Sequence, residues 1–446
     1  MLTHAADGYQ KLGKIPPSIE AVIQQVENAL KDHPKLAQIF RNGYTDTYEK
    51  TMFRLEDGSI FVLTGDIPAM WLRDSSAQII PYLIPAKNDP QLASVIAGLI
   101  KRQCANILLD PYANAFNAAP NNHGHRRDKT AMSPWVWERK YEIDSLCYPL
   151  HLASLFWKRF DKDPLALDSF RNELIAAVEK VLDVWTIELN HDTQSPYRFQ
   201  RIQGPLGLLA FIDSLPRKGL GAKCVPTGMI WSGFRPSDDK CVYPYLIPSE
   251  MFAVVVLKDI IEMFDDQDFI IEKARSLFTS IESGIDQYAF YKHPTYGQVY
   301  AFEVDGLGHQ LLMDDANVPS LLSAPYLGYC EITDPIYQNT RKMILSAANP
   351  FYFEGKFGKG IGSRHTFPAK NRIWHIALSM QGMTAETKEE KWDMLRMLAQ
   401  TDADTGYMHE SFDVNNPKHY TRPWFSWANM MYCHLMLDYL DIKMDS

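Results

Sequence analysis

The sequence predicts an all-α fold, an (α/α)6 barrel in which six helical hairpins form an inner and an outer ring, with short β-hairpins in the loops. Apolar residues recur at helical spacing along most of the chain, helices of two kinds alternate, and strand signals are few and short. No Ser/Gly-rich linker and no low-complexity tract divides the 446 residues, so we expect one domain spanning 1–446.

One kind of predicted helix is amphipathic, with apolar residues on a single face. In the first of these, Ile19, Val22 and Val26 share a face. In the last, Thr387 and Glu390 are spaced as in a capping box, which marks a helix start. The amphipathic segments are 19–30, 174–185, 270–281 and 392–398.

The other kind of predicted helix is apolar on most sides. Segments 145–157, 249–264 and 424–440 have this composition, which indicates burial on every face. They alternate along the chain with half-exposed helices, giving about a dozen helical segments in all. Such alternation is what an inner ring of helices sheathed by an outer ring requires.

Strands are expected in only two places, at 59–64 after the Asp57-Gly58 turn and at 298–304. The longest stretch without a good helix pattern is 195–245, where Pro and Gly recur. A loop of that length in a compact domain is usually functional.

Composition restricts the partners. The formal net charge is −9 and no basic stripe is present, which argues against nucleic acid and permits a neutral ligand. No window reaches 18 apolar residues, so no membrane span is expected. The six cysteines form no C-x-x-C pair and are expected as free thiols. Without a signal-peptide pattern, a cytoplasmic monomer is the simplest interpretation, although a secreted protein whose leader has been removed stays open.

The first polar cluster, within 64–78, contains Asp66, Trp71, Arg73 and Asp74. An indole can form an apolar platform, and Arg and Asp make directional hydrogen bonds to hydroxyl groups. The alternative is that Asp74 or the neighbouring serine caps the next helix.

Two further clusters lie before residue 146. Segment 121–128 contains His123, His125 and Asp128, which have weak metal-site spacing; a sugar-contact loop or a plain surface loop is favoured over a metal. Segment 141–145 contains Glu142 and Asp144 at the start of a buried helix, where Asp144 could instead be an N-cap.

The fourth polar region is 231–240, which contains the adjacent residues Asp238 and Asp239. Adjacent carboxylates repel, which tends to raise the pKa of one of them, and a general acid requires a raised pKa. The alternative is a solvated turn.

Two carboxylate clusters lie nearer the C-terminus. Segment 313–320 contains Asp314, Asp315 and Asn317 and is expected to open a helix. Segment 406–416 contains Glu410 among His409, a serine and aromatic residues, so Glu410 is a candidate for activating water; a surface ion pair is the alternative. In a helical ring these helix starts converge at one end, and two carboxylates flanking a sugar are the minimum for glycoside hydrolysis.

The motifs TGDIPAMWLRDSSAQ, YEIDSLCYPL, WSGFRPSDDKCVYPYLIPSEMF, LLMDDANVPSLL and GYMHESFDVNNP resemble glycoside hydrolase family 125, in order, from about residue 20 to the C-terminus. The resemblance implies an (α/α)6 barrel that removes non-reducing terminal mannose from α-1,6-linked mannosides, with inversion and without metal or cofactor. It assigns the general acid to Asp238 or Asp239, with Asp238 favoured, and the general base to Glu410. The acid and base carboxyl groups are then expected about 6.5–9.5 Å apart.

The remaining candidate residues are expected to bind the terminal mannose. Three alternatives stay open: an exo-glycosidase for another sugar, an inactive carbohydrate-binding protein, and another α/α toroid such as a zinc-dependent prenyltransferase subunit. The natural mannose-containing oligosaccharide also stays open. The substrate-binding candidates are Asp66, Trp71, Arg73, Asp74, His123, Glu142, Asp144, Asp314, Asp315, Asn317, Arg364 and His365.

Overall fold

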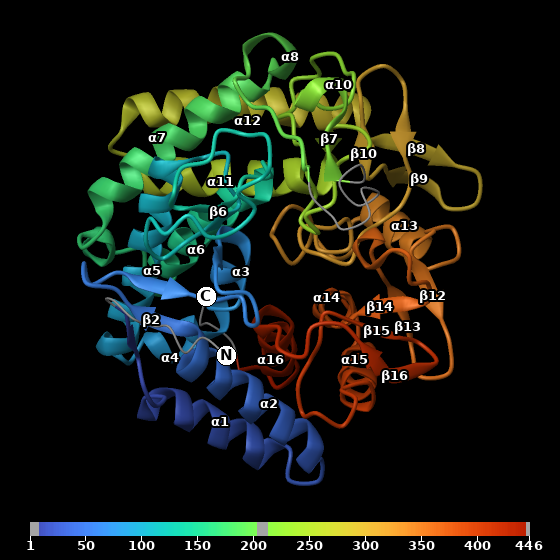
Figure 1. Ribbon diagram of the computed structural model, residues 1–446. Helices are drawn as coiled ribbons and strands as arrows, with labels where there is room; N and C mark the ends of the chain where they lie inside the picture. The colour runs from blue at the N-terminus through green and yellow to red at the C-terminus, as the bar shows by residue number, and fades with distance from the viewer. Residues whose placement is uncertain (1–8, 203–212, 443–446) are drawn as a thin grey trace.

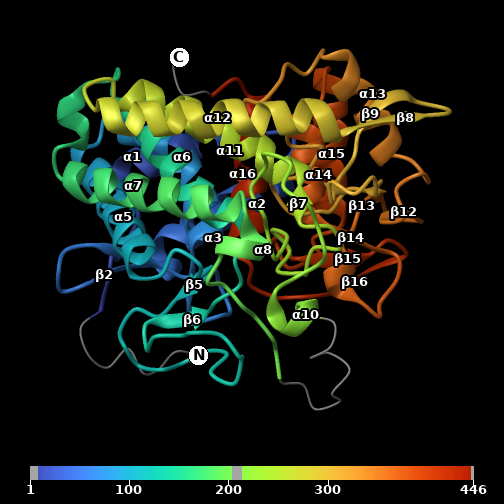
Figure 2. The same ribbon diagram turned by 90° about the horizontal axis from the view of Figure 1, so that it is seen from above.

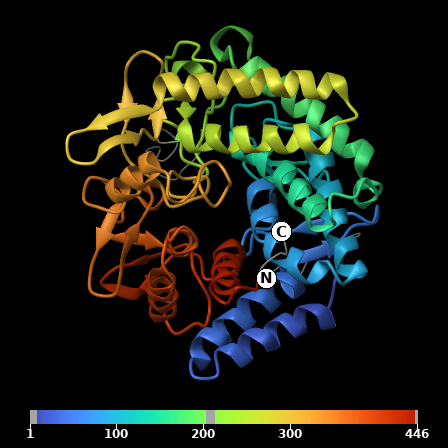
Figure 3. The same ribbon diagram turned by 180° about the vertical axis from the view of Figure 1, so that it is seen from behind.

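The computed structural model describes residues 9–202 and 213–442, in which helices from the whole chain form a ring. Figures 1 and 3 show this ring from its two ends, and the last long helix, α16, closes it by packing on α2. The helices are α1 (Pro17–Ala29), α2 (Pro34–Asp46), α3 (Leu72–Ala77), α4 (Leu83–Ala86), α5 (Pro90–Leu109), α6 (Ile143–Arg159), α7 (Arg171–Glu188), α8 (His191–Gln194), α10 (Pro216–Gly219), α11 (Ile247–Met263), α12 (Asp268–Tyr288), α13 (Pro335–Ile344), α14 (His375–Met383), α15 (Lys388–Gln400) and α16 (Ser426–Tyr439).

The two predicted kinds of helix are confirmed. Almost every side chain of α11 is buried, and the helix packs between α6 and α12. By contrast α12 buries one face only, and Figure 2 shows it on the outside of α11. The wholly apolar sequence of α11 and the one-sided pattern of α12 follow from these positions.

The predicted start of α15 is also confirmed. The Thr387 side chain accepts a hydrogen bond from the backbone N–H of Glu390 at 3.2 Å. This bond satisfies one of the N–H groups that the first helical turn leaves without an intrahelical partner.

The prediction that segment 313–320 opens a helix is wrong, because residues 321–328 form turns. Pro325 lacks a backbone N–H, and Gly328 has a left-handed φ of 89°, and both features disfavour a continuous helix through this segment. The buried Asp314 carboxylate stabilises the turns by accepting the backbone N–H groups of Leu321 at 2.9 Å and Leu322 at 3.0 Å.

Short antiparallel strands decorate the ring. The prediction at 59–64 is confirmed by β3, but 298–304 divides into β9 and β10, which belong to different sheets. The strands are β1 (Gln10–Lys11), β2 (Met52–Arg54), β3 (Ile60–Val62), β4 (Met70–Trp71), β5 (Ala115–Phe116), β6 (Val136–Glu138), β7 (Tyr245–Leu246), β8 (Phe290–His293), β9 (Gly297–Tyr300), β10 (Glu303–Val304), β11 (Gln310–Leu311), β12 (Tyr352–Glu354), β13 (Lys359–Ile361), β14 (Arg372–Trp374), β15 (Ser411–Asp413) and β16 (Asn416–Tyr420).

Two of the sheets precede the helices α3 and α14 and so place polar residues at the starts of these helices. The sheet β4-β5-β6 leads directly into α3, and β14-β15-β16 leads from β14 into α14. Figure 2 shows β5 and β6 at one end of the ring, the end that also carries α10 and β16. The predicted convergence of helix starts is therefore observed.

Helix α5 is the one helix among residues 9–202 and 213–442 that is long and apolar enough to cross a membrane by length and composition. It contains Lys101 and Arg102, and 56% of its most apolar window is buried inside the protein. It packs against α7, α6 and β3, so its apolar face belongs to the core of the ring.

Candidate active site

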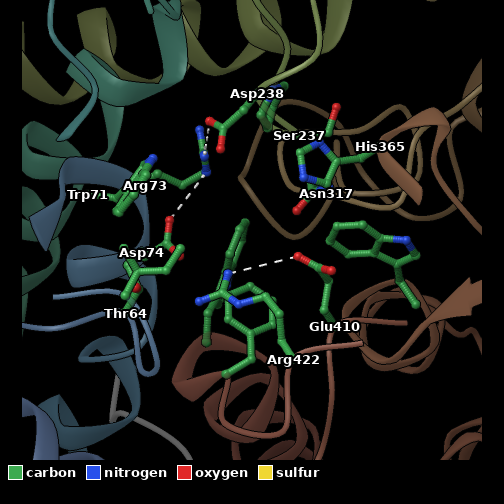
Figure 4. A pocket seen from close by; sticks show the side chains of 15 residues that line it. Thr64, Trp71, Arg73, Asp74, Ser237, Asp238, Asn317, His365, Glu410 and Arg422 are labelled. Carbon is green, nitrogen blue, oxygen red and sulfur yellow. Dashed lines mark hydrogen bonds and ion pairs between the residues drawn. The ribbon is translucent and has the colours of Figure 1, made fainter. Parts of the chain in front are cut away.

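A cavity of ≈220 Å³ lies at one end of the ring. It is smaller than the roughly 300–1,000 Å³ of pockets that hold drug-sized ligands, which suits a small polar ligand. Figure 4 shows Asp238 on one wall and Glu410 on the facing wall, with Arg73 and Asp74 to the side. The cavity is lined by Thr64, Ile67, Trp71, Arg73, Asp74, Pro236, Ser237, Asp238, Asn317, His365, Trp374, Glu410, Arg422, Phe425 and Trp427.

The wall formed by residues 64–74 is fixed to the far end of the chain. Gly65 pairs with Phe425 in a β-bridge, with φ 137°, and a Cβ there would lie only 2.4 Å from the carbonyl oxygen of Trp424. Only glycine fits this conformation and this close approach. The contact brings Trp71 and Asp74 beside residues that lie about 350 positions later.

Trp71 forms an apolar part of the cavity wall. It ends β4, is 6% exposed, and packs with Ala69 and Ala115. A flat indole at the edge of a polar cavity offers a surface on which a sugar ring can stack.

Asp238 lies at the tip of a tight turn. The Arg235 backbone N–H donates to the carbonyl of Asp239 at 2.8 Å, and the Asp238 N–H donates to the carbonyl of Arg235 at 2.9 Å. Asp238 itself has a left-handed φ of 64°, which Asp tolerates better than most residues. Lys140 Nζ donates to the Asp238 carbonyl at 2.6 Å and holds the turn against the start of α6.

Glu410 is positioned by its neighbour His409. The His409 ring stacks on Tyr420 at 3.7 Å between centroids, and its backbone N–H donates to His375 Nδ1 at 2.8 Å. Burial lowers the pKa of His375 to about 3, so this ring is neutral and can accept the bond. Glu410 then extends from the start of β15 into the cavity, with Arg422 Nη1 at 3.8 Å from Oε1.

Arg73 is the cation at the centre of a carboxyl cluster. It is 2% exposed, and its Nη1 donates to Glu142 Oε2 at 2.6 Å and to Asp144 Oδ2 at 3.0 Å. Its Nη2 donates to Asp238 Oδ1 at 3.2 Å, and its Nε lies 3.6 Å from Asp74 Oδ2. One guanidinium therefore faces four carboxyl groups.

The excess of carboxyl groups makes several of them hard to ionise. Burial raises the pKa of Asp74 to about 6 and that of Asp144 to about 6, against the opposing charge of Arg73. Burial, together with the charges of Asp238 and Asp144, holds the pKa of Glu142 well above its ordinary value. The cluster therefore retains protons at higher pH than isolated carboxyl groups do.

The prediction that one carboxyl group of the Asp238–Asp239 pair has a raised pKa is wrong. Burial disfavours ionisation of both residues, but nearby cations outweigh it and hold both pKa values below the usual range. The two carboxyl groups point to different partners: Asp238 to Arg73, and Asp239 to His365, whose Nδ1 lies 3.5 Å from Oδ1. Adjacency in sequence therefore does not produce the expected repulsion.

His365 is a cation on the cavity wall. Its side chain is 38% exposed toward the cavity; partial desolvation would lower its pKa, but the hydrogen-bonded Asp239 and the charges of Glu410 and Asp238 raise the pKa of His365 to about 10. It lines the cavity beside Asn317, so the wall between the two proposed catalytic carboxylates carries hydrogen-bond donors.

The chain matches the model of the metal-independent alpha-mannosidase family, GH125, over residues 33–437. The chain belongs to glycoside hydrolase family 125. It is 40% identical over 451 residues to the meiotically up-regulated gene 157 protein of Schizosaccharomyces pombe, an alignment that covers 96% of this chain and 86% of that protein. It is 49% identical, with a TM-score of 0.92, to a Streptococcus pneumoniae α-mannosidase solved in a non-productive substrate complex with α-1,6-mannobiose. That match covers 97% of this chain and 100% of the solved one.

Several predicted site residues of this family 125 enzyme do not line the cavity. Glu142 and Asp144 are buried beneath Arg73, and neither caps α6 through its side chain. Asp66 pairs with Arg422, whose Nε donates to Oδ1 at 2.9 Å. Asp315 accepts from Ser363 Oγ at 3.0 Å.

Three more predicted residues of the mannosidase are placed away from the cavity lining. Asp314 binds backbone N–H groups in the turns after it, as described above. His123 and Arg364 are exposed and do not line the cavity. Among the predicted site residues, those that line the cavity are Trp71, Arg73, Asp74, Asp238, Asn317, His365 and Glu410.

The weak metal-site spacing of 121–128 has a different explanation in the mannosidase. Asp128 accepts from Arg201 Nη2 at 2.8 Å, and Arg201 also pairs with Glu138, whose Oε1 lies 3.6 Å from His125 Nε2. Within the described residues, no three His, Cys, Asp or Glu side chains are arranged to hold a metal ion. All six cysteines are free.

Sequence reasoning missed Arg422 and Trp374, both of which line the cavity. Arg422 has a left-handed φ of 50°, and its guanidinium lies 4.3 Å from the centroid of Phe425, between Asp66 and Glu410. The signal was available: Arg422 and Phe425 belong to a polar and aromatic run just after the Glu410 cluster. Trp374 had no such signal, because it joins the site only through pairing of β14 with β15.

Proposed function

We propose that this family 125 enzyme is an exo-acting α-1,6-mannosidase that inverts configuration in a single displacement. The observation that supports this proposal most directly is that Asp238 and Glu410 occupy facing walls of one small cavity. An inverting glycosidase requires an acid on one side of the scissile bond and a base on the other. The α-1,6-mannobiose bound by the Streptococcus pneumoniae relative supports the linkage.

Asp238, rather than Asp239, is the proposed general acid. Asp238 lines the cavity, and its Oδ1 is held by Arg73 and Asn114 at 3.2 Å each, which leaves Oδ2 for the substrate. Asp239 lies behind His365 and does not line the cavity. Its role is to hold His365 charged and oriented.

In the proposed step, Asp238 gives a proton to the glycosidic oxygen as the bond from that oxygen to C1 breaks. A water molecule attacks C1 from the opposite face and passes a proton to Glu410. We expect the two carboxyl groups to be about 6.5–9.5 Å apart, because a water molecule must fit between Glu410 and the sugar.

The remaining lining residues bind the terminal mannose in this proposal. Trp71 and Trp374 supply apolar faces, and Arg73, Asp74, Asn317 and His365 bind hydroxyl groups. The small volume of the cavity supports removal of one terminal sugar at a time.

The barrel architecture, the domain organisation, the oligomeric state and the cellular location are part of the same proposal. We assign α3, α6, α11, the turns at 321–328, α14 and α16 to the inner ring of an (α/α)6 barrel, with the turns in place of a fourth inner helix. A single catalytic domain, a monomeric state and a cytoplasmic location are also proposed; the free cysteines support the last of these.

A mannobiose panel tests the function. Purified enzyme is incubated with the α-1,2, α-1,3, α-1,4 and α-1,6 isomers in EDTA, and released mannose is measured. We expect hydrolysis of the α-1,6 isomer alone or with strong preference. Preference for another isomer would refute the linkage, and inhibition by EDTA that added metal reverses would refute the metal-free step.

A further inference from the structure

We propose that Glu142 stores the proton that Asp238 delivers, so that the general acid of this enzyme is a pair of carboxyl groups rather than one residue. Glu142 does not line the cavity, and its side chain is fully buried beneath Arg73. It is thus a positioning residue that acts through Asp238. The inference rests on the proposed role of Asp238 as the acid.

Shared donors place the two carboxyl groups side by side. Arg73 donates to Glu142 through Nη1 and to Asp238 through Nη2. Asn114 Nδ2 lies 3.2 Å from Asp238 Oδ1 and 3.4 Å from Glu142 Oε1. Two donors therefore bridge the same two carboxyl groups, and the groups are close enough to hydrogen-bond each other.

The bonding pattern identifies the oxygen that carries the proton. Glu142 Oε2 accepts from Arg73 at 2.6 Å and from Ser145 Oγ at 2.8 Å, so it is the oxygen with two donors. Oε1 has only the longer contact to Asn114, through the same Nδ2 that contacts Asp238 Oδ1. A proton on Oε1 satisfies this buried oxygen, because it can be donated to the Asp238 carboxylate.

Charge balance requires a stored proton. Arg73 faces Glu142, Asp144, Asp238 and Asp74, and a second cation, Lys140, reaches only the Asp238 backbone carbonyl. Two buried carboxylates side by side that share one cation with two further carboxyl groups are unfavourable, and one proton shared between them removes that repulsion. The other groups around the pair are Glu138, His365, Tyr197 and Cys241.

Most of the charged groups around the Glu142–Asp238 pair already have a partner of opposite charge. Lys140 Nζ lies 3.8 Å from Glu138 and 3.5 Å from Asp213, and Arg201 bonds Glu138, Asp213 and Asp128, so both cations are already paired within this outer group. His365 is paired with Asp239. Arg73 is therefore the cation that directly contacts both members of the pair, among the described residues.

Substrate binding moves the proton to the correct residue. The Asp238 side chain is 22% exposed through the cavity, whereas Glu142 is already fully buried. A bound sugar excludes water from Asp238 and so raises its affinity for the proton more than that of Glu142. The proton shifts from Glu142 Oε1 to Asp238 and then to the glycosidic oxygen, and solvent reprotonates the pair after the product leaves.

Leaving-group dependence tests the proposal. The variants Glu142→Gln, Asp238→Asn and Asp144→Asn are compared on α-1,6-mannobiose and on 2,4-dinitrophenyl α-mannoside, whose leaving group needs no proton. Asp144 is the matched control, because it is equally buried and bonds the same Arg73 nitrogen. General-acid catalysis contributes about 10²–10⁴-fold.

We expect Glu142→Gln to lose at least about 100-fold in kcat/KM on the disaccharide and less than about 10-fold on the aryl mannoside. The alkaline limb of its pH–rate profile moves to lower pH, because Asp238 loses the neighbouring negative charge that helps it keep a proton. Asp144→Asn loses both activities by the same factor.

Equal losses on both substrates in Glu142→Gln would overturn the proposal and leave Glu142 with a structural role. If Asp238→Asn also lost both equally, the acid assignment itself would fail, which is a separate result. If Glu142→Gln does not fold by circular dichroism, Glu142→Asp replaces it: its shorter carboxyl group withdraws from Asp238, and the loss must again be larger on the disaccharide.

Discussion

Replacing Arg73 by Met tests whether one buried guanidinium neutralises the carboxyl cluster. The side chain is 2% exposed and donates to Glu142, Asp144 and Asp238. Removing one partner from a buried ion pair costs about 3–5 kcal/mol, because the remaining charge is left without compensation. Since unfolding entropy is about 2 cal/mol/K per residue, 446 residues lose about 1 °C in Tm per kcal/mol. We expect Tm to fall by about 3–5 °C at pH 8.

The fall should depend on pH. Burial raises the pKa of Asp74 and Asp144 to about 6, so their contribution to stability is present below their unfolded pKa of about 3.9 and is lost as the pH rises through about 6. Without Arg73 these carboxyl groups ionise at still higher pH, so the variant differs least from the wild type at pH 4–5. Differential scanning fluorimetry at pH 5 and pH 8 measures both values.

Arg396→Met is the matched control. Arg396 pairs with Asp393, but both side chains are more than half exposed, and such pairs contribute at most about 1 kcal/mol. An Arg73→Met variant that matched this control at both pH values would refute the idea that Arg73 compensates buried charge.

Three further variants test other parts of the site. Glu410→Gln removes the proposed base, so kcat on α-1,6-mannobiose should fall about 10²–10⁴-fold with little change in KM, and azide should restore turnover as β-mannosyl azide; azide without effect would argue against the base role. Arg422→Leu removes the cation 3.8 Å from Glu410 Oε1, which helps to orient this carboxylate, so kcat on α-1,6-mannobiose should fall by up to about 100-fold; an unchanged kcat would show that Arg422 acts only on Asp66. Gly65→Ala places a Cβ 2.4 Å from the Trp424 carbonyl and strains a φ of 137°, so Tm should fall by about 1–3 °C, from roughly 1–3 kcal/mol of strain; an unchanged Tm would mean that the β-bridge between Gly65 and Phe425 is not required.

The helices were predictable because the burial of one face or of all faces of a helix gives the apolar residues a distinct spacing in the sequence. The one-sided pattern of α12 and the all-round apolarity of α11 each match the position observed. The turns at 321–328 were not predictable from the same signal, because residues 321–324 and 327 are buried, as they would be in a buried helix. What decides the outcome is Pro325, Gly328 and the carboxylate of Asp314, which binds backbone N–H groups.

The residue types of the site were predictable from the sequence. Which of these residues line the cavity and which lie beneath it was not. Asp238 and Glu410 line the cavity as expected, whereas Glu142 lies beneath it at a similar motif position. Sequence spacing cannot separate a residue that touches substrate from one that holds its neighbour. The lowered pKa of Asp238 was missed for the same reason, since it depends on Arg73, which lies 165 positions earlier in the chain.

The stereochemistry of the first product tests the central claim most directly, namely that Asp238 and Glu410 act from opposite faces in one step. Enzyme and α-1,6-mannobiose are mixed in D2O with EDTA, and the anomeric proton signals are followed by NMR from the first minutes. The account predicts that β-mannose appears first and that α-mannose grows only as mutarotation proceeds. Initial release of α-mannose would show a double displacement with retention and would contradict the proposed mechanism.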